Sequence, residues 1–165
     1  MTSWIVSEDV LAQEPLIRDA RRDDIARIVD LYRSDELTRK HHADADAPVE
    51  AGYYASFDAI ERDPRNRLLV AELGFIVVGS FQLTFVPDMS PSGNDVAIIE
   101  NVIVDAALRG HNIGSVMMRW AIEEATRSNC HRVTLTSSKQ RKDAHRFYER
   151  LGFEPTHEGM KIVLA

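Results

Sequence analysis

The segment Arg109-Gly110-His111-Asn112-Ile113-Gly114-Ser115 joins an apolar, strand-like run at residues 96–104 to an amphipathic helical pattern that begins at Ile113. In such a junction, loop N–H groups and the positive end of the following helix converge on one point, where an anion binds. The two glycines let the main chain come close to a ligand. The segment therefore predicts a binding site for phosphate groups.

The glycine spacing excludes two common phosphate-binding loops. Three residues separate Gly110 from Gly114, and Ser115 follows without a lysine. A nucleotide P-loop needs four residues between its glycines and then Gly-Lys-Ser/Thr. The dinucleotide fingerprint G-x-G-x-x-G does not fit the spacing either. A phosphorylated cofactor of another kind is expected.

Length and composition predict one folded domain. The chain has 165 residues, of which 44% are hydrophobic, and this argues against disorder. We expect an N-terminal arm at residues 1–14 and a single domain at residues 15–165. Acidic residues at Glu8, Asp9 and Glu14 interrupt the start of the chain, so nothing there resembles a signal peptide or a membrane span. These features predict a cytoplasmic protein with no membrane partner.

The charge is distributed unevenly. The net charge is −6, yet the stretch from Arg109 to Arg150 holds nine Lys/Arg and four Asp/Glu. A basic segment around the loop suits a polyanionic cofactor, whereas the acidic remainder does not suit nucleic acid. We therefore expect no nucleic-acid partner.

Periodicity predicts an α/β fold whose elements follow the order βααβββαβαβ. Hairpins in the first half and βα units in the second favour a mixed sheet with helices on both faces. The expected strands lie at residues 15–18, 67–73, 75–86, 96–104, 131–137, and 153 with 160–164, and the expected helices at 24–33, 49–62, 113–129 and 143–151.

The loop resembles the central motif Gln/Arg-x-x-Gly-x-Gly/Ala of the GCN5-related N-acetyltransferase (GNAT) superfamily, with Arg109, Asn112 and Gly114 at the three positions. Asn112 stands where glycine is usual, but asparagine tolerates a positive φ, so the turn can form. A second family feature is the helix and turn at residues 144–153, with a tyrosine at Tyr148. The resemblance covers residues 16–164 and implies a GNAT-like acyl-CoA N-acyltransferase fold.

Three features are also similar to aminoalkylphosphonate N-acetyltransferases: residues 109–115, residues 143–148, and the pair His41-His42. This similarity implies direct acetyl transfer from acetyl-CoA to a primary amine of a small molecule. Acceptors resembling an aminoalkylphosphonate, a polyamine or an aminoglycoside all remain open. The alternatives are a protein N-terminal or lysine acetyltransferase, and a non-catalytic acyl-CoA-binding relative.

The resemblance also implies which residues hold the cofactor. The pantetheine arm would pair with the backbone of the strand before the loop, and the pyrophosphate would rest on loop N–H groups. Arg109 would add positive charge, and Arg141 or Lys142 would approach the 3′-phosphate. The expected cofactor-binding residues are Val102, Ile103, Val104, Arg109, Gly110, His111, Asn112, Ile113, Gly114, Ser115 and Arg141.

Two residues are candidates for catalysis. Tyr148 would protonate the departing thiolate, because the family places this tyrosine beside the sulfur. Glu100 is the candidate base, since a carboxylate inside an apolar run needs a partner, although a structural polar contact is the alternative.

Four further residues are candidates for contact with the acceptor: Asn101, His41, His42 and His145. The adjacent histidines in a polar loop are also considered as metal ligands, but no metal site is predicted. The oligomeric state stays open between a monomer and a homodimer.

Overall fold

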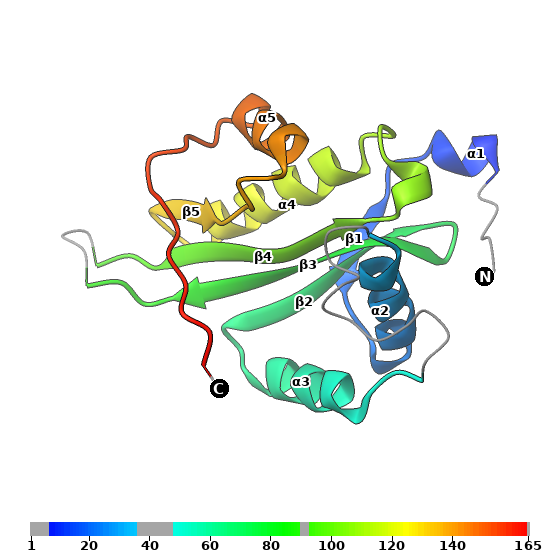
Figure 1. Ribbon diagram of the computed structural model, residues 1–165, viewed down its shortest axis with the longest axis horizontal. Helices are drawn as coiled ribbons and strands as arrows, with labels where there is room; N and C mark the ends of the chain where they lie inside the picture. Colours follow the sequence, from blue (N-terminus) through cyan, green and yellow to red (C-terminus); the bar gives the residue numbers. More distant parts are fainter. Residues whose placement is uncertain (1–6, 36–47, 90–92, 165) are drawn as a thin grey trace.

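The computed structural model describes residues 7–35, 48–89 and 93–164. Its centre is a sheet of five strands that lie side by side in chain order (Figure 1). The first four strands are antiparallel, and the fifth joins the fourth in parallel. The strands are β1 (Leu16–Asp19), β2 (Asn66–Leu73), β3 (Ile76–Val86), β4 (Val96–Val104) and β5 (Arg132–Leu135).

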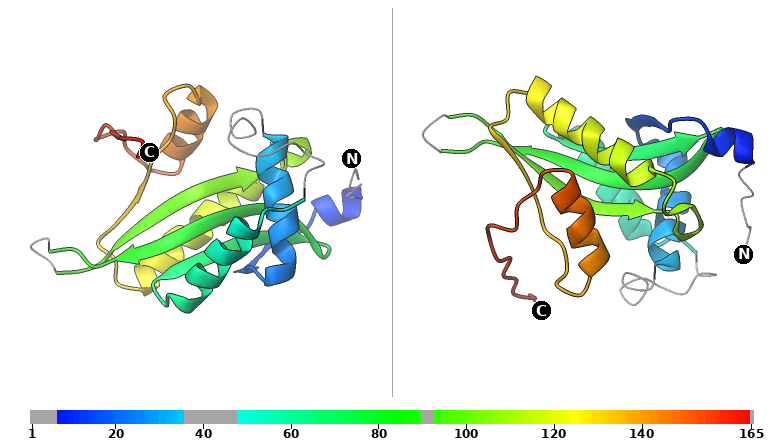
Figure 2. Two further views of the ribbon diagram at one scale, coloured as in Figure 1. Left: turned by 60° about the horizontal axis from the view of Figure 1, so that its bottom comes forward. Right: turned by 90° about the horizontal axis from the view of Figure 1, so that it is seen from above.

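Helices cover both faces of this sheet, as Figures 1 and 2 show. One face carries α2 (Ile25–Ser34) and α3 (Ala51–Arg62), and the other carries α4 (Ile113–Arg127). The remaining helical elements are α1 (Glu8–Leu11), α5 (Lys142–Arg150) and the short 3-10 turns η1 (Arg22–Asp24) and η3 (Ala106–Leu108). The predicted mixed α/β fold is therefore confirmed. Across the described part of the chain, no helix is long and apolar enough to cross a membrane.

Each face of the sheet has its own apolar core, because successive strand residues point to opposite faces. On β2, Leu69 packs on the α4 side together with Phe81 and Met117. Its neighbour Val70 packs on the other side, beneath α2 and α3, together with Phe57. Burial of both apolar layers is the main force that holds the helices against the sheet.

The pairing of β3 with β4 is interrupted by a bulge. Ser80 lies opposite Ile103, but Gln82 lies opposite Glu100, so β4 contains one residue more than β3 in this interval. Asn101 takes up the irregularity with a φ of 53°. The parallel pairing of β4 with β5 also stops here, at Ile99 and Leu135. Beyond this point, no strand of the described residues pairs with β4 on its β5 side.

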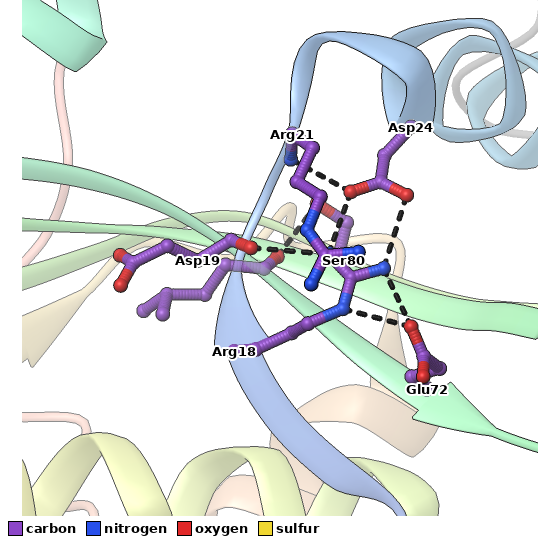
Figure 3. Close-up of polar contacts among 7 residues, drawn as sticks. Arg18, Asp19, Arg21, Asp24, Glu72 and Ser80 are labelled. Atoms are coloured by element: carbon purple, nitrogen blue, oxygen red, sulfur yellow. Dashed lines mark hydrogen bonds and ion pairs between the residues drawn. The ribbon is translucent and has the colours of Figure 1, made fainter. Parts of the chain in front are cut away.

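A polar network fastens the opposite edge of the sheet (Figure 3). Arg18 on β1 donates from Nε to Glu72 on β2 (2.7 Å) and from Nη1 to Asp24 (2.7 Å). Asp24 also accepts from the backbone N–H of Arg21 (2.7 Å). One guanidinium thereby joins β1, β2 and the turn that leads into α2.

One expectation needs correction. The last strand is not formed: residues 151–164 contain no strand, and Met160, Ile162 and Leu164 are exposed. An apolar pattern alone is insufficient, because a strand also needs a neighbour for its backbone groups, and this segment pairs with none of the described strands. The N-terminal arm includes one helical turn, α1, whose Val10 and Leu11 pack against the core.

Candidate active site

Two pockets flank the bulge in β4. The first, of about 170 Å³, lies between β4, β5 and α5 and is called here the β5-side pocket. The second, of about 270 Å³, lies between α2, α3 and the sheet and is called the α3-side pocket. Asn101 and Val102 line both pockets. The bulge is therefore where two separate cavities meet.

Tyr148 of α5 lines the β5-side pocket. Its ring contacts Phe147 and Phe153, with centroids 5.2 and 5.8 Å away. Burial raises the pKa of the Tyr148 hydroxyl above its ordinary value, although the nearby Arg141 acts in the opposite direction. The hydroxyl thus remains protonated at neutral pH and is able to donate a proton into this pocket.

The α3-side pocket combines apolar walls with a row of hydrogen-bonding groups. Ile28 and Phe57 belong to the walls. The Tyr32 hydroxyl donates to the carbonyl oxygen of Asn101 (3.1 Å), and Nδ2 of Asn101 donates to Oε1 of Gln82 (3.3 Å). Burial raises the pKa of Tyr32, so this hydroxyl also stays protonated. The pocket is suited to a small molecule that is partly apolar and forms hydrogen bonds.

The segment at residues 109–115, called here the phosphate loop after its predicted ligand, adopts the positive-φ turn that its sequence predicts. Gly110 and Asn112 have φ values of 88° and 63°. Asn112 occupies the N-cap position of α4, but its side chain makes no capping hydrogen bond. The first N–H groups of this helix therefore receive no cap from Asn112, and a helix start of this kind is suited to binding an anion.

The start of the loop is anchored by Asp105, the residue after β4. One of its oxygens accepts from the backbone N–H of Ala107 (3.0 Å), and the other pairs with Arg27 of α2 (2.5 Å). Arg27 also donates to the carbonyl of Val77 on β3 (3.0 Å). The loop is thus tied to both α2 and the sheet.

Gly114 has a packing role that sequence reasoning missed. A Cβ at this position would lie 3.3 Å from Cζ of Phe147 and 3.9 Å from Cγ2 of Val104. The absence of a side chain at Gly114 therefore lets α5 approach the start of α4. Because Phe147 precedes Tyr148, this close contact also sets the position of the tyrosine.

The two arginines expected to contact phosphates meet at one carboxylate. Asp35, directly after α2, accepts from Nη2 of Arg109 (2.6 Å) and from Nη2 of Arg141 (2.9 Å). Sequence reasoning did not find Asp35, since 74 and 106 residues separate it from its partners and no local motif marks it.

Two of the other expected site residues, Glu100 and His145, do not line the same pocket. Glu100 lines the β5-side pocket and is exposed, and its side chain makes no hydrogen bond or ion pair with any other described residue. His145 lies 3.0 Å through Nε2 from the carbonyl of Ser138 and lines neither pocket. His41 and His42 lie outside the described residues.

Comparison with known proteins agrees with this architecture. The sequence model of the acetyltransferase (GNAT) family matches residues 25–153 of this chain. A Bacillus halodurans structure described as a transcriptional regulator is 40% identical and has a TM-score of 0.87, covering 92% of this chain and 100% of that one.

Two curated enzymes match over shorter stretches. The aminoalkylphosphonate N-acetyltransferase of Salmonella typhimurium is 38% identical over 39% of this chain and 42% of its own length. The glucosamine 6-phosphate N-acetyltransferase of Trypanosoma brucei brucei is 33% identical over 53% of this chain and 58% of its own length. The chain thus spans about half the length of these relatives. The family match, which runs through both pockets and the phosphate loop, shows that the chain belongs to the GNAT family of acetyltransferases.

Proposed function

We propose that this protein transfers an acetyl group from acetyl-CoA directly to a primary amine of a small molecule. The observation that carries the proposal is the junction of two pockets at Asn101 and Val102, with Tyr148 in one of them. A thioester in the β5-side pocket and an amine in the α3-side pocket would meet at the bulge. Two reactants held this way react without a covalent enzyme intermediate.

The β5-side pocket and the phosphate loop form the donor site in this proposal. The pyrophosphate rests on the uncapped N–H groups at the start of α4, and Arg109 and Arg141 contribute positive charge. The pantetheine arm runs along residues 102–104, where none of the described strands pairs with β4 on its β5 side. Tyr148 donates its proton to the thiolate that leaves when the C–S bond breaks and the C–N bond forms.

The acceptor amine must lose a proton before or during its attack. Glu100, at the edge of the β5-side pocket, is the candidate that removes it, directly or through water. Asn101 holds the acceptor near the thioester carbonyl. Both curated relatives are named for small amine substrates, which supports a small molecule over a peptide.

The test measures free thiol released from acetyl-CoA in the presence of amine panels. One panel holds aminoalkylphosphonates, polyamines, aminoglycosides and amino sugars, and the other holds peptides with free N-termini or lysines. Direct transfer predicts initial-rate plots that intersect when both substrates are varied. Transfer to peptides alone would establish the protein acetyltransferase instead.

A second candidate is a non-catalytic, acyl-CoA-binding role. The Bacillus halodurans relative that is described as a transcriptional regulator favours it. Binding of acetyl-CoA, seen by calorimetry, without transfer to any member of either panel would support this role over catalysis.

A further inference from the structure

Asp35 joins three elements that lie far apart in the sequence. It follows α2 directly, and its side chain is only 5% exposed. Its partners include Arg109 in the phosphate loop and Arg141 at the N-cap of α5. Each arginine contacts a different oxygen of the carboxylate, Oδ2 and Oδ1 respectively. One buried carboxylate therefore fixes the distance between the loop and α5.

The two arginines keep most of their hydrogen-bonding capacity. A guanidinium has five N–H donors in a planar fork. Arg109 and Arg141 each contact Asp35 through Nη2 alone, and neither guanidinium has another partner within the described residues. The Arg109 side chain is 53% exposed, so its remaining donors are accessible to a second anion. Asp35 therefore restrains both side chains and leaves most of their N–H donors available.

The restraint extends to the helix that carries Tyr148. No residue of α5 is fully buried, so apolar packing alone holds this helix only weakly. Arg141 lines the β5-side pocket and lowers the pKa of Tyr148 against the effect of burial. The ion pair with Asp35 keeps this guanidinium at the pocket.

We infer that Asp35 is a positioning residue for the phosphorylated donor, an inference that rests on the proposed function. By holding Arg109 and Arg141 in place before the donor arrives, it reduces the side-chain entropy that binding costs. The effect acts through the phosphate groups. A carboxylate that merely stabilised the fold would not distinguish a donor with phosphates from one without them.

The experiment compares coenzyme A with pantetheine, which lacks the phosphates, by isothermal titration calorimetry. Asp35→Asn is expected to weaken coenzyme A binding by about 10-fold and to leave pantetheine binding unchanged. Asp35→Glu, which keeps the charge, should recover part of the loss. Asp30→Asn is the matched control, because Asp30 lies on the exposed side of α2. Thermal unfolding verifies that each variant is folded, and Asp35→Ser repeats the test if Asp35→Asn does not fold.

A double-mutant cycle with Arg141→Gln tests the route of the effect. If Asp35 acts through Arg141, the loss of coenzyme A binding free energy in the double variant should be smaller than the sum of the losses in the two single variants. Equal losses for coenzyme A and pantetheine, or no loss for either, would overturn the inference. Failure of the wild-type protein to bind coenzyme A would instead overturn the proposed function.

Discussion

The hydroxyl of Tyr32 donates a hydrogen bond to the carbonyl oxygen of Asn101 across 3.1 Å. This contact ties α2 to the bulge in β4, at the point where the two pockets meet. A bulge leaves part of the ladder unpaired, so a side-chain donor at this carbonyl helps to keep the irregular backbone in place. The geometry of the bulge therefore depends on a helix as well as on the sheet.

Tyr32→Phe should lower kcat/KM for the acceptor and leave the affinity for coenzyme A unchanged. Loss of the hydrogen bond is expected to reduce the free energy of unfolding by about 1 kcal/mol. Tyr54→Phe is the control, because Tyr54 lies on α3 outside both pockets and stacks with Arg22. Steady-state kinetics with the best amine, together with calorimetry, provides the measurement. An equal loss in both variants would speak against a special role for this contact.

Tyr148→Phe should lower kcat by about 100-fold or more, because the departing thiolate loses its proton donor. The phenylalanine ring can keep the contacts with Phe147 and Phe153, so the affinity for coenzyme A should hold. Kinetics and calorimetry on the same preparation separate the two effects. Unchanged turnover would remove Tyr148 from its proposed role.

The pH dependence of kcat gives a separate test of Tyr148. A general acid must be protonated, and burial raises the pKa of this hydroxyl above its ordinary value of 10.0. Because the raised pKa keeps this hydroxyl protonated at alkaline pH, kcat should fall on the alkaline side only above pH 10. If kcat of the wild type began to fall near pH 8, and kcat of Tyr148→Phe did not, the pKa of Tyr148 would be lowered. That result would contradict the structure.

Gly114→Ala should lower kcat by about 10-fold, with little change in stability. The new Cβ would lie 3.3 Å from Cζ of Phe147, so this ring and the part of α5 that carries it must move by a few tenths of an ångström and displace Tyr148 as well. The higher helix propensity of alanine offsets part of the cost of this contact. Gly52→Ala in α3 is the control, because no atom lies within 4 Å of its added Cβ. Full activity of Gly114→Ala would show that α5 adjusts without moving the tyrosine.

Acid should weaken the edge of the sheet through Asp24. Burial raises the pKa of this carboxyl, but hydrogen bonds from Arg18 and from the backbone of Arg21 outweigh it and hold the pKa below its ordinary value. Its contribution to stability is therefore complete above the unfolded pKa, near 3.8, and is lost as the pH falls through the lower folded value.

Asp24→Asn should reduce the free energy of unfolding at pH 7 by about 1–2 kcal/mol and flatten its decline between pH 4 and pH 2. Denaturant unfolding at several pH values measures both effects. Asp23→Asn, at the exposed neighbouring position, should change neither. An unchanged slope in Asp24→Asn would assign the acid sensitivity to other carboxylates.

Local sequence signals predicted most of the fold. Helical spacing found α2, α3, α4 and α5, and alternation or apolar runs found the five strands, because these patterns report which face of an element is buried. The segment at residues 160–164 is the exception. Its apolar residues resemble a strand, but pairing depends on a neighbour that the local pattern does not specify.

The residues of the candidate site likewise include some that local sequence motifs predict and some that they do not. The positive φ of Asn112 was predicted from a motif that is continuous in the sequence, and it is confirmed. The phosphate-binding role of the loop and the proton-donor role of Tyr148 come from motifs of the same kind and stay predictions. Asp35 was not found, and neither were Tyr32 and the other residues that line only the α3-side pocket, because each is an ordinary residue until folding brings distant elements together. The bulge was also invisible: residues 102–104 are apolar throughout, so no change of face shows in their pattern.

Asn101 is a surplus residue as far as the sheet is concerned. If it were deleted, β3 and β4 could pair without interruption, and residues 102–104 would keep the faces that they now have. The resulting sheet would be more regular, with an unbroken strand as the wall between the two pockets. The chain thus retains a residue that strand pairing does not require, at the point where the two pockets adjoin.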